Sequence, residues 1–289
     1  MATSAEIQAL VDKIPPLDSK DLKNPMLKTR PSDGKFTGPP WDEAVKILDP
    51  ILAGGKDGIA AVVDLLKEVD NGEDYKARYV LHALAQYVCR ADKSEQQEFY
   101  VSALASALDG RPKPIVKFLL QQLQVCADGR VAAKIGKLLL DDDVFEEAAL
   151  ALLAIREGAV EQFRAALPKV KGKAKLTLIQ DLGVLKDPAS AGAMREALDG
   201  DDVALKMAAA WGLANLGEAS AVDAILKAAD VKDIWPRAQM TKACLILAEK
   251  LQTAGKADEA KRIYTHLRDT RKDESESYVR EAAAKALGG

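Results

Sequence analysis

The chain has 289 residues, 48% of them hydrophobic and 29% charged, which are ordinary proportions for a folded protein. Its 41 basic and 44 acidic residues give a net charge of −3. This balance argues against a dedicated nucleic-acid binder, because such proteins neutralise phosphates with an excess of Lys and Arg. The longest apolar runs hold about eight residues, as at 148–155, and are too short to span a bilayer. No basic segment followed by an apolar run opens the sequence, so we expect a cytoplasmic protein, although removal of a leader would leave the same sequence.

The first 40 residues differ in composition from the rest of the chain. After a short helix predicted over Ala5–Lys13, the segment 14–40 holds six of the twelve prolines. Proline lacks a backbone N–H and ends regular structure, so we predict a Pro-rich irregular N-terminal arm over 1–40. The arm is either an irregular cap on the fold that follows or a tether or lid over it.

From residue 41 to residue 289 the sequence predicts one continuous array of helices. The first two helix pairs are expected over Trp41–Leu52 with Asp57–Val69 and over Asp74–Cys89 with Ser94–Leu108. In the third of these helices Tyr75 and Tyr79 lie one turn apart, as do Arg78 and His82. This strip is a candidate partner-binding surface, because exposed Tyr and Arg are common hot-spot residues. The alternative is that the tyrosines pack between repeats.

Four helix–turn–helix units of nearly constant length occupy 112–232. Aligned on the end of the first helix, they recur at steps of 30, 30 and 31 residues, at Val125, Ile155, Leu185 and Leu216. In the last unit Gly217 suits the left-handed residue that ends a helix, and the Ala-rich stretch 208–214 allows neighbouring helices to approach closely. One such unit cannot bury its apolar faces alone, whereas stacked units can. The period therefore predicts an all-α, right-handed α-solenoid of about six or seven helix pairs.

After residue 232 the units change length. A longer helical hairpin is predicted over 233–272, followed by a terminal helix over 275–287. The acidic run 141–143 precedes a first helix, where carboxylates favour the positive end of the helix dipole. No oxygen-rich loop with the spacing of a calcium site is present.

The units AAAWGLANLG (208–217) and YVREAAAKALG (278–288) resemble HEAT-like repeats, particularly the short bacterial kind found in phycobilin lyases. Such repeats often carry a basic residue early in the first helix, where this chain has Lys175, Lys206 and Arg280; Phe145 departs from that pattern. The style of the units is also similar to uncharacterised HEAT-repeat proteins of planctomycete-type bacteria. The resemblance implies a bacterial helical-repeat protein that binds partners, and it implies no chemistry.

Three successive second helices end in KLLL, RAAL and REAL, which predicts that Lys137, Arg164 and Arg195 stack in register, with Leu226 breaking the row. In HEAT-like solenoids the second helices usually line the concave face. The resemblance therefore implies a basic row on that face, suited to another protein or an acidic peptide. The alternative is that Lys and Arg merely fill the solvated positions of amphipathic helices.

No catalytic or metal-binding constellation is visible in the sequence. The three cysteines are widely spaced and predicted to be buried, reduced thiols, and the two histidines are far apart: Cys89, Cys126 and Cys244, His82 and His266. Neither a nucleophile elbow nor a phosphate-binding glycine loop occurs. We predict a non-catalytic protein-binding scaffold or adaptor with no cofactor and no metal. A ligand-handling enzyme of bilin-lyase-like type and a structural segment of a longer repeat protein are the alternatives.

Overall fold

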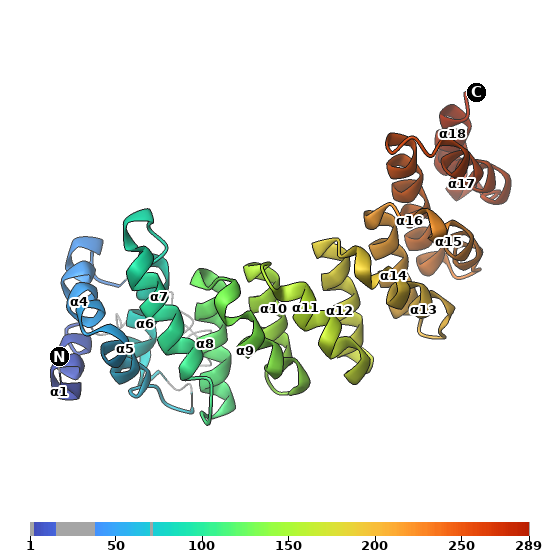
Figure 1. The fold of residues 1–289 in the computed structure, drawn as a ribbon. Coiled ribbons are helices and arrows are strands. Elements are labelled where there is room, and N and C mark those ends of the chain that lie inside the picture. Colours follow the sequence, from blue (N-terminus) through green and yellow to red (C-terminus); the bar gives the residue numbers. More distant parts are fainter. Residues whose placement is uncertain (1–2, 16–37, 70–71, 289) are drawn as a thin grey trace. The chain divides into compact units, whose positions relative to one another are not determined.

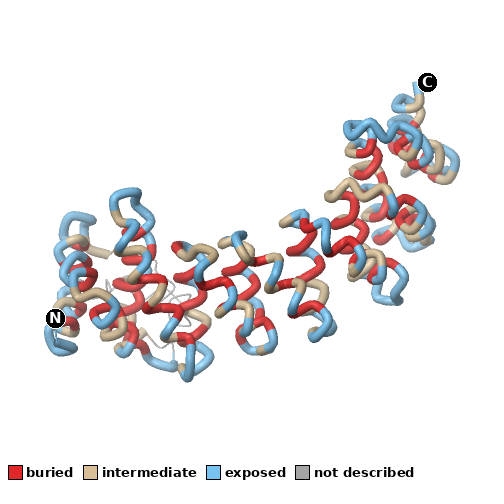
Figure 2. The backbone as a smooth tube through the Cα atoms, viewed as in Figure 1, coloured by how far each residue is buried: buried red, intermediate tan, exposed pale blue. Residues whose placement is uncertain are grey.

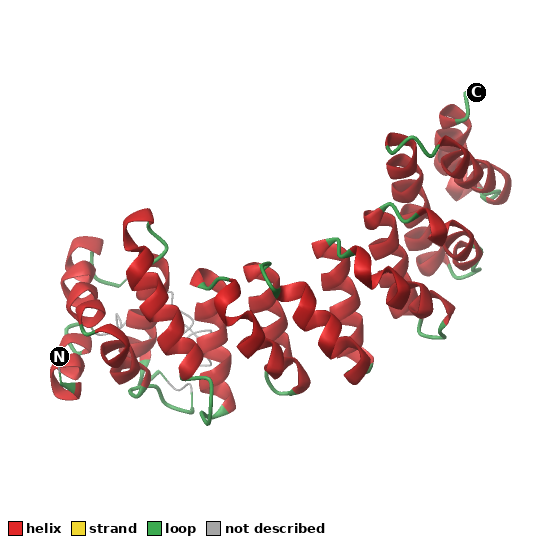
Figure 3. Cartoon of the chain, in the orientation of Figure 1, coloured by secondary structure: helices red, strands yellow, loops and turns green. Residues whose placement is uncertain are grey.

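The computed structural model describes residues 3–15, 38–69 and 72–288, and within these ranges every regular element is a helix (Figure 1). Short loops join the helices (Figure 3). The all-α prediction is confirmed. Within the described ranges seven helix pairs follow one another from α4–α5 to α16–α17, in agreement with the six or seven pairs expected.

The chain divides into two compact units, Met1–Gln162 and Phe163–Gly289. The boundary lies inside the helix α11 (Ala159–Ala166). Most helices carry a buried stripe and an exposed face, which is the amphipathic pattern that a stacked array requires (Figure 2). The helix α14 (Val203–Leu216) is an exception, because positions 208–210 and 212–214 are all buried.

The first unit begins with a short helix that belongs to its core. The helix predicted over Ala5–Lys13 is present as α1 (Ser4–Val11), opened by a capping box between Thr3 and Glu6. It packs against its neighbours with Ile7 and Val11 fully or almost fully buried. The predicted irregular segment falls largely on residues 16–37, which lie outside the described residues. The other helices of this part are α4 (Trp41–Ala53), α5 (Gly55–Val63), α6 (Tyr75–Tyr87) and α7 (Ser94–Ser106).

In the rest of the first unit, the first helices of successive pairs pack in a row. α6 contacts α8, and α8 contacts α10. The second helix of the pair that α8 begins is short, and it continues as a 3₁₀ turn. The elements are α8 (Lys113–Cys126), α9 (Ala132–Gly136), η3 (Lys137–Leu140), α10 (Phe145–Ile155) and α11.

The second unit shows the repeat architecture in two rows of helices. α12, α14 and α16 pack successively in one row, α13, α15 and α17 in the other, and α18 packs on α17. This stacking confirms the predicted α-solenoid of helix–turn–helix units. The helices are α12 (Gly172–Leu185), α13 (Ala191–Asp199), α14 (Val203–Leu216), α15 (Val222–Ala229), α16 (Ile234–Thr253), α17 (Ala257–Thr270) and α18 (Ser277–Ala286).

Small residues set the distance between α12 and α14. A Cβ atom added at Gly183 would lie 3.0 Å from the Cα of Gly212 and 3.1 Å from the Trp211 ring, and one added at Gly212 would lie 2.8 Å from the Met194 sulfur. The neighbouring Ala209 is fully buried. The close approach predicted from the Ala- and Gly-rich stretch of α14 is confirmed.

The alignment of the repeats needs a correction of one residue at its first member. Four leucines, each fully buried, occupy the same position three residues before a helix end: Leu123, Leu152, Leu182 and Leu213. The corresponding end of α8 is therefore the buried Cys126, and the predicted Val125 is exposed. The left-handed residue after the helix is Gly217 in one unit, as predicted, and Lys186 in another, with φ values of 70° and 55°.

Candidate functional site

Lys137 does not share a register position with the two arginines of the predicted basic row. Four buried residues mark equivalent core positions of the second helices: Ile135, Phe163, Met194 and Ile225. Arg164 and Arg195 each follow their core residue directly, whereas Lys137 comes two residues after Ile135. The equivalent of the arginines in that helix is Gly136. Lys137 itself is exposed at the start of η3.

Arg164 and Arg195 point at the acidic turn of the repeat that follows each of them. The Nε of Arg164 lies 3.6 Å from the carboxylate of the buried Asp187. The Nη1 of Arg195 donates to the Ser220 hydroxyl at 2.9 Å and lies 4.0 Å from the Glu218 carboxylate. Each arginine thus connects a second helix to the next helix–turn–helix unit.

The break in the row at Leu226 fits the same interpretation. Asp187 and Glu218 occupy the turns after α12 and α14, and hydrogen bonds from Ser190 and Ser220 hold them there. The turn after α16 reads Ala254–Lys256 and carries no acid. Within the second unit, arginine occupies this position where the following turn supplies a carboxylate, and leucine occupies it where that turn has none. In the first unit the turn after α10 carries Glu157 although Gly136 holds the position.

Tyr75 and Tyr79 contact the flanks of the N-terminal segment. The Tyr75 hydroxyl donates to the carbonyl of Pro15 at 3.1 Å. The Tyr79 ring lies so close to Gly38 that a Cβ atom there would be 2.0 Å from a ring carbon. Partial burial raises the pKa of the Tyr79 hydroxyl above its ordinary value. Both side chains are half-buried, and their role in partner binding stays a prediction.

Arg78 is buried, contrary to the exposed strip predicted for this helix. Its Nε donates to both oxygens of the Asp74 carboxylate at 3.0 Å, and its guanidinium lies 4.8 Å from the Phe118 ring centroid. A buried guanidinium needs such a partner, because an uncompensated charge in the core is costly. His82 is exposed and hydrogen-bonds to Gln86 and Gln122.

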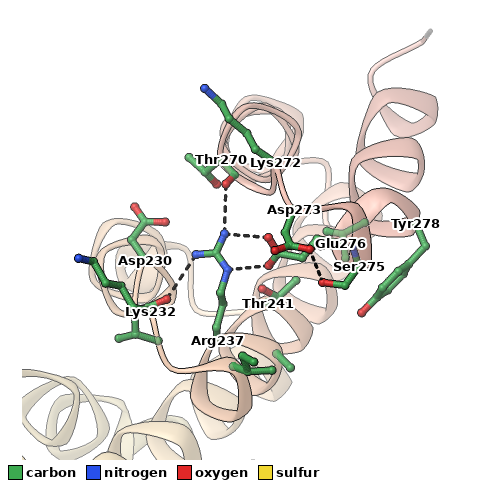
Figure 4. A pocket seen from close by; sticks show the side chains of 14 residues that line it. Asp230, Lys232, Arg237, Thr241, Thr270, Lys272, Asp273, Ser275, Glu276 and Tyr278 are labelled. Atoms are coloured by element: carbon green, nitrogen blue, oxygen red, sulfur yellow. Dashed lines mark hydrogen bonds and ion pairs between the residues drawn. The ribbon is translucent and has the colours of Figure 1, made fainter.

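A cavity of about 520 Å³ opens in the second unit, between the start of α16, the end of α17 and the start of α18 (Figure 4). It falls within the size range of ligand and peptide pockets. Charged, hydroxyl and large apolar side chains line it. Those that bear on its chemistry are Lys232, Ile234, Arg237, Lys272, Glu276 and Tyr278.

Two arginines held by carboxylates stabilise the floor of this C-terminal cavity. Arg237 donates to Glu276 from Nε at 2.6 Å and from Nη2 at 3.0 Å, a bidentate pair, and its Nη2 also donates to the Thr270 carbonyl. Arg271 is completely buried behind it. Its guanidinium donates to the Thr241 hydroxyl, the Ala229 carbonyl and the Asp230 carboxylate, at 2.9, 2.8 and 3.3 Å. Because these donors are bound, the floor has a defined shape.

The acids of the cavity are engaged, and its lysines are not. Besides Arg271, Asp230 contacts Nε2 of His266 at 3.0 Å. Asp273 accepts hydrogen bonds from the backbone and hydroxyl of Ser275, which lower the pKa of its carboxyl. Among the described residues, Lys232 and Lys272 have no carboxylate within ion-pair distance. In Figure 4 both ammonium groups extend outward from Arg237. The lining holds three acids and three bases, and the bases without an ion-pair partner among the described residues are these two lysines.

Large apolar side chains lie exposed beside these charges. Ile234 is 84% exposed and Tyr278 66% exposed, and both line the cavity. Trp235, which follows Ile234 in the first turn of α16, is 65% exposed. Exposed aromatic residues around a pocket mark interaction surfaces more often than isolated exposed apolar residues do.

Sequence reasoning missed this cavity. The sequence does hold one indication of an exposed apolar surface, the pair Ile234-Trp235 directly after a polar turn. These residues lie in the first turn of their helix, and no preceding turn covers their side chains. Nothing in the sequence indicates that Arg271 is buried, because a basic residue after a helix end is ordinarily exposed to solvent.

Among the cysteines, Cys126 and Cys244 are buried as predicted, and Cys89 is exposed. Burial raises the pKa of the Cys244 thiol to about 12. Cys89 lies beyond the last residue of α6, with its sulfur 3.1 Å from the Ala85 carbonyl, and this position at a helix end explains its exposure. Within the described ranges no group of three His, Cys, Asp or Glu residues could hold a metal ion. In the same ranges no helix has both the length and the apolar character needed to cross a membrane.

No protein-family model matches the chain, and no curated protein matches it with significant sequence similarity. Solved structures with similar folds include an engineered protein, at 16% identity and a TM-score of 0.44 over 100% of this chain and 92% of that one. Another is the complex of CpcE and CpcF of phycocyanin lyase from Nostoc sp. PCC7120, at 17% identity and a TM-score of 0.35 over 92% of this chain and 94% of that one. Human deoxyhypusine hydroxylase matches at 14% identity and a TM-score of 0.34 over 99% and 96%. At these identities the likenesses concern the helical-repeat fold alone.

Proposed function

We propose that this chain is a non-catalytic scaffold that binds another protein through the surface around the C-terminal cavity. The observation that carries the proposal is a group of large, exposed apolar side chains: Ile234 and Tyr278, which line the cavity, and Trp235, which follows Ile234 in the chain. Aromatic side chains supply much of the energy of protein interfaces, because each buries a large area at a low cost in side-chain entropy.

The fold supports the same proposal. A helical array presents a surface that is already formed, so a partner binds without first ordering a loop. In the cavity the arginines are held by the protein's own carboxylates and carbonyls, an arrangement that favours a stable binding surface over a reactive site.

The proposal is tested by affinity capture from the native host with the full-length chain, read by quantitative mass spectrometry. We would compare the wild type with the triple variant Ile234→Ser, Trp235→Ser and Tyr278→Ser. A matched control replaces three exposed apolar residues outside the cavity, Val69→Ser, Leu140→Ser and Leu150→Ser, which are 67%, 52% and 51% exposed.

We expect a partner that the wild type and the control retain and that the cavity variant loses. A partner lost instead from a Lys137→Glu, Arg164→Glu and Arg195→Glu variant would move the binding surface to the predicted basic row. Copurification of a chromophore or other small molecule with no protein partner would overturn the proposal in favour of a ligand-handling role.

A further inference from the structure

We propose that the C-terminal cavity binds an acidic peptide segment of the partner, with a large apolar side chain entering between Ile234 and Tyr278 and flanking carboxylates meeting Lys232 and Lys272. This inference rests on the proposed function and names the chemistry of the partner.

The charge of the partner follows from which groups in the cavity are already bound. Glu276 is held by Arg237 at 2.6 Å and lies 3.7 Å from Arg271. Asp230 is held by His266 and Arg271, and Asp273 by Ser275. Glu276 and Asp230 are thus already paired with arginines, and Asp273 accepts two hydrogen bonds from Ser275. An acidic partner would meet two lysines that make no ion pair in the described part of the chain.

The Nη1 donor of Arg237 also favours an acidic partner. Its Nη1 donates to the Val231 carbonyl at 3.4 Å, which is long for a hydrogen bond. An incoming carboxylate at the cavity would improve on that contact. The guanidinium is fixed in place by Glu276, so the anion would meet a donor that needs no reorganisation.

The apolar component follows from the cavity wall. Ile234 lies at the start of α16 and Tyr278 at the start of α18. Both side chains line the cavity and are exposed to solvent. A space of about 520 Å³ admits a large side chain together with part of the peptide that carries it. The partner segment thus combines a Phe, Trp, Leu or Ile anchor with neighbouring Asp or Glu.

The test is selection of peptides from an unbiased phage-displayed library against the full-length chain. Affinities of the selected peptides are then measured by fluorescence anisotropy. The charge variant is Lys232→Glu with Lys272→Glu. Its matched control is Lys227→Glu with Lys261→Glu, two exposed lysines of the same unit that do not line the cavity.

We expect the selected peptides to be enriched in acidic residues beside an aromatic or aliphatic residue. Their affinity should fall at least about tenfold in the charge variant, since like charges facing each other across an interface cost several kcal/mol, and less than about twofold in the control. Ile234→Ser with Tyr278→Ser should also abolish binding, and rising salt should weaken it.

Peptides without acidic enrichment, equal binding by the charge variant, or no selected peptide would each overturn the inference. These outcomes are distinguishable from failure of the proposed function. If capture of the partner depends on Ile234, Trp235 and Tyr278 but the charge variant still captures it, the scaffold function is supported and the acidic-peptide inference is wrong. If acidic peptides bind but no protein is captured, the proposed scaffold function is wrong, while the cavity is still a site that binds acidic peptides.

Discussion

Asp181 lies in the middle of α12 with only 8% of its surface exposed, and burial raises the pKa of its carboxyl from 3.8 to about 6. A raised pKa means that the folded state disfavours the charged form. The cost to stability begins as pH rises through 3.8 and is complete above pH 6, because the unfolded chain ionises first. A shift of two pKa units corresponds to roughly 3 kcal/mol.

Asp181→Asn removes this cost, so we expect it to raise the free energy of unfolding at pH 7 by about 2 kcal/mol, the remainder being lost to desolvation of the amide. At pH 4 the gain should nearly vanish. Denaturant unfolding at both pH values checks this, with the exposed Asp199→Asn as control. An equal gain at pH 4 and pH 7 would show that ionisation of Asp181 is not the cause.

At the scale of single helices, the contact of α12 with α14 depends on Gly183. A methyl group there would lie 3.0 Å from the backbone of Gly212 and 3.1 Å from the Trp211 ring, so α12 and α14 would have to separate. Overpacking of this kind costs about 1–3 kcal/mol, against about 1 kcal/mol gained in helix propensity. We expect Gly183→Ala to lower the free energy of unfolding by about 1 kcal/mol.

Gly192 provides the matched control, because it also lies in a helix of the second unit but an added Cβ atom would meet nothing within 4 Å. Gly192→Ala should raise stability by about 0.5 kcal/mol through helix propensity alone. Urea unfolding of the two variants measures both signs. Stabilisation by both substitutions would mean that the α12–α14 contact is looser than the Gly183–Gly212 approach indicates.

The elements of this fold were predictable because local signals agree with one another. The buried leucines recur at nearly constant spacing, and Gly217 ends α14 as its left-handed conformation requires. The sequence predicts the end of α8 one residue early, at Val125, because Val125 and Cys126 are both apolar and only burial distinguishes them.

The C-terminal cavity was not predictable, since its floor joins residues far apart in the chain. Arg237 pairs with Glu276 across 39 positions, and Arg271 reaches Asp230 across 41. Nothing in the local sequence tells which of the many charged residues will be buried. Arg164 and Asp187 illustrate the same limit, because their pairing depends on how one unit stacks on the next.

On the scale of the whole molecule, contacts between helices are mostly between neighbours in the chain, as in α12 with α14 and α14 with α16. The stability of such an array is approximately a sum of the stabilities of its units and of the interfaces between adjacent units. A change within the second unit should therefore weaken that unit more than the first.

Hydrogen exchange read by mass spectrometry tests this with Gly183→Ala. Peptides from α12 and α14 should exchange faster than in the wild type, by about fivefold for a loss of 1 kcal/mol, while peptides from α4 to α7 keep their rates. The reason is that an opening confined to the second unit leaves the helices of the first unit folded. Gly192→Ala serves as control and should slow exchange in α13. Uniform acceleration in both units would instead mean that the chain unfolds as one cooperative body and that stability cannot be assigned to its units.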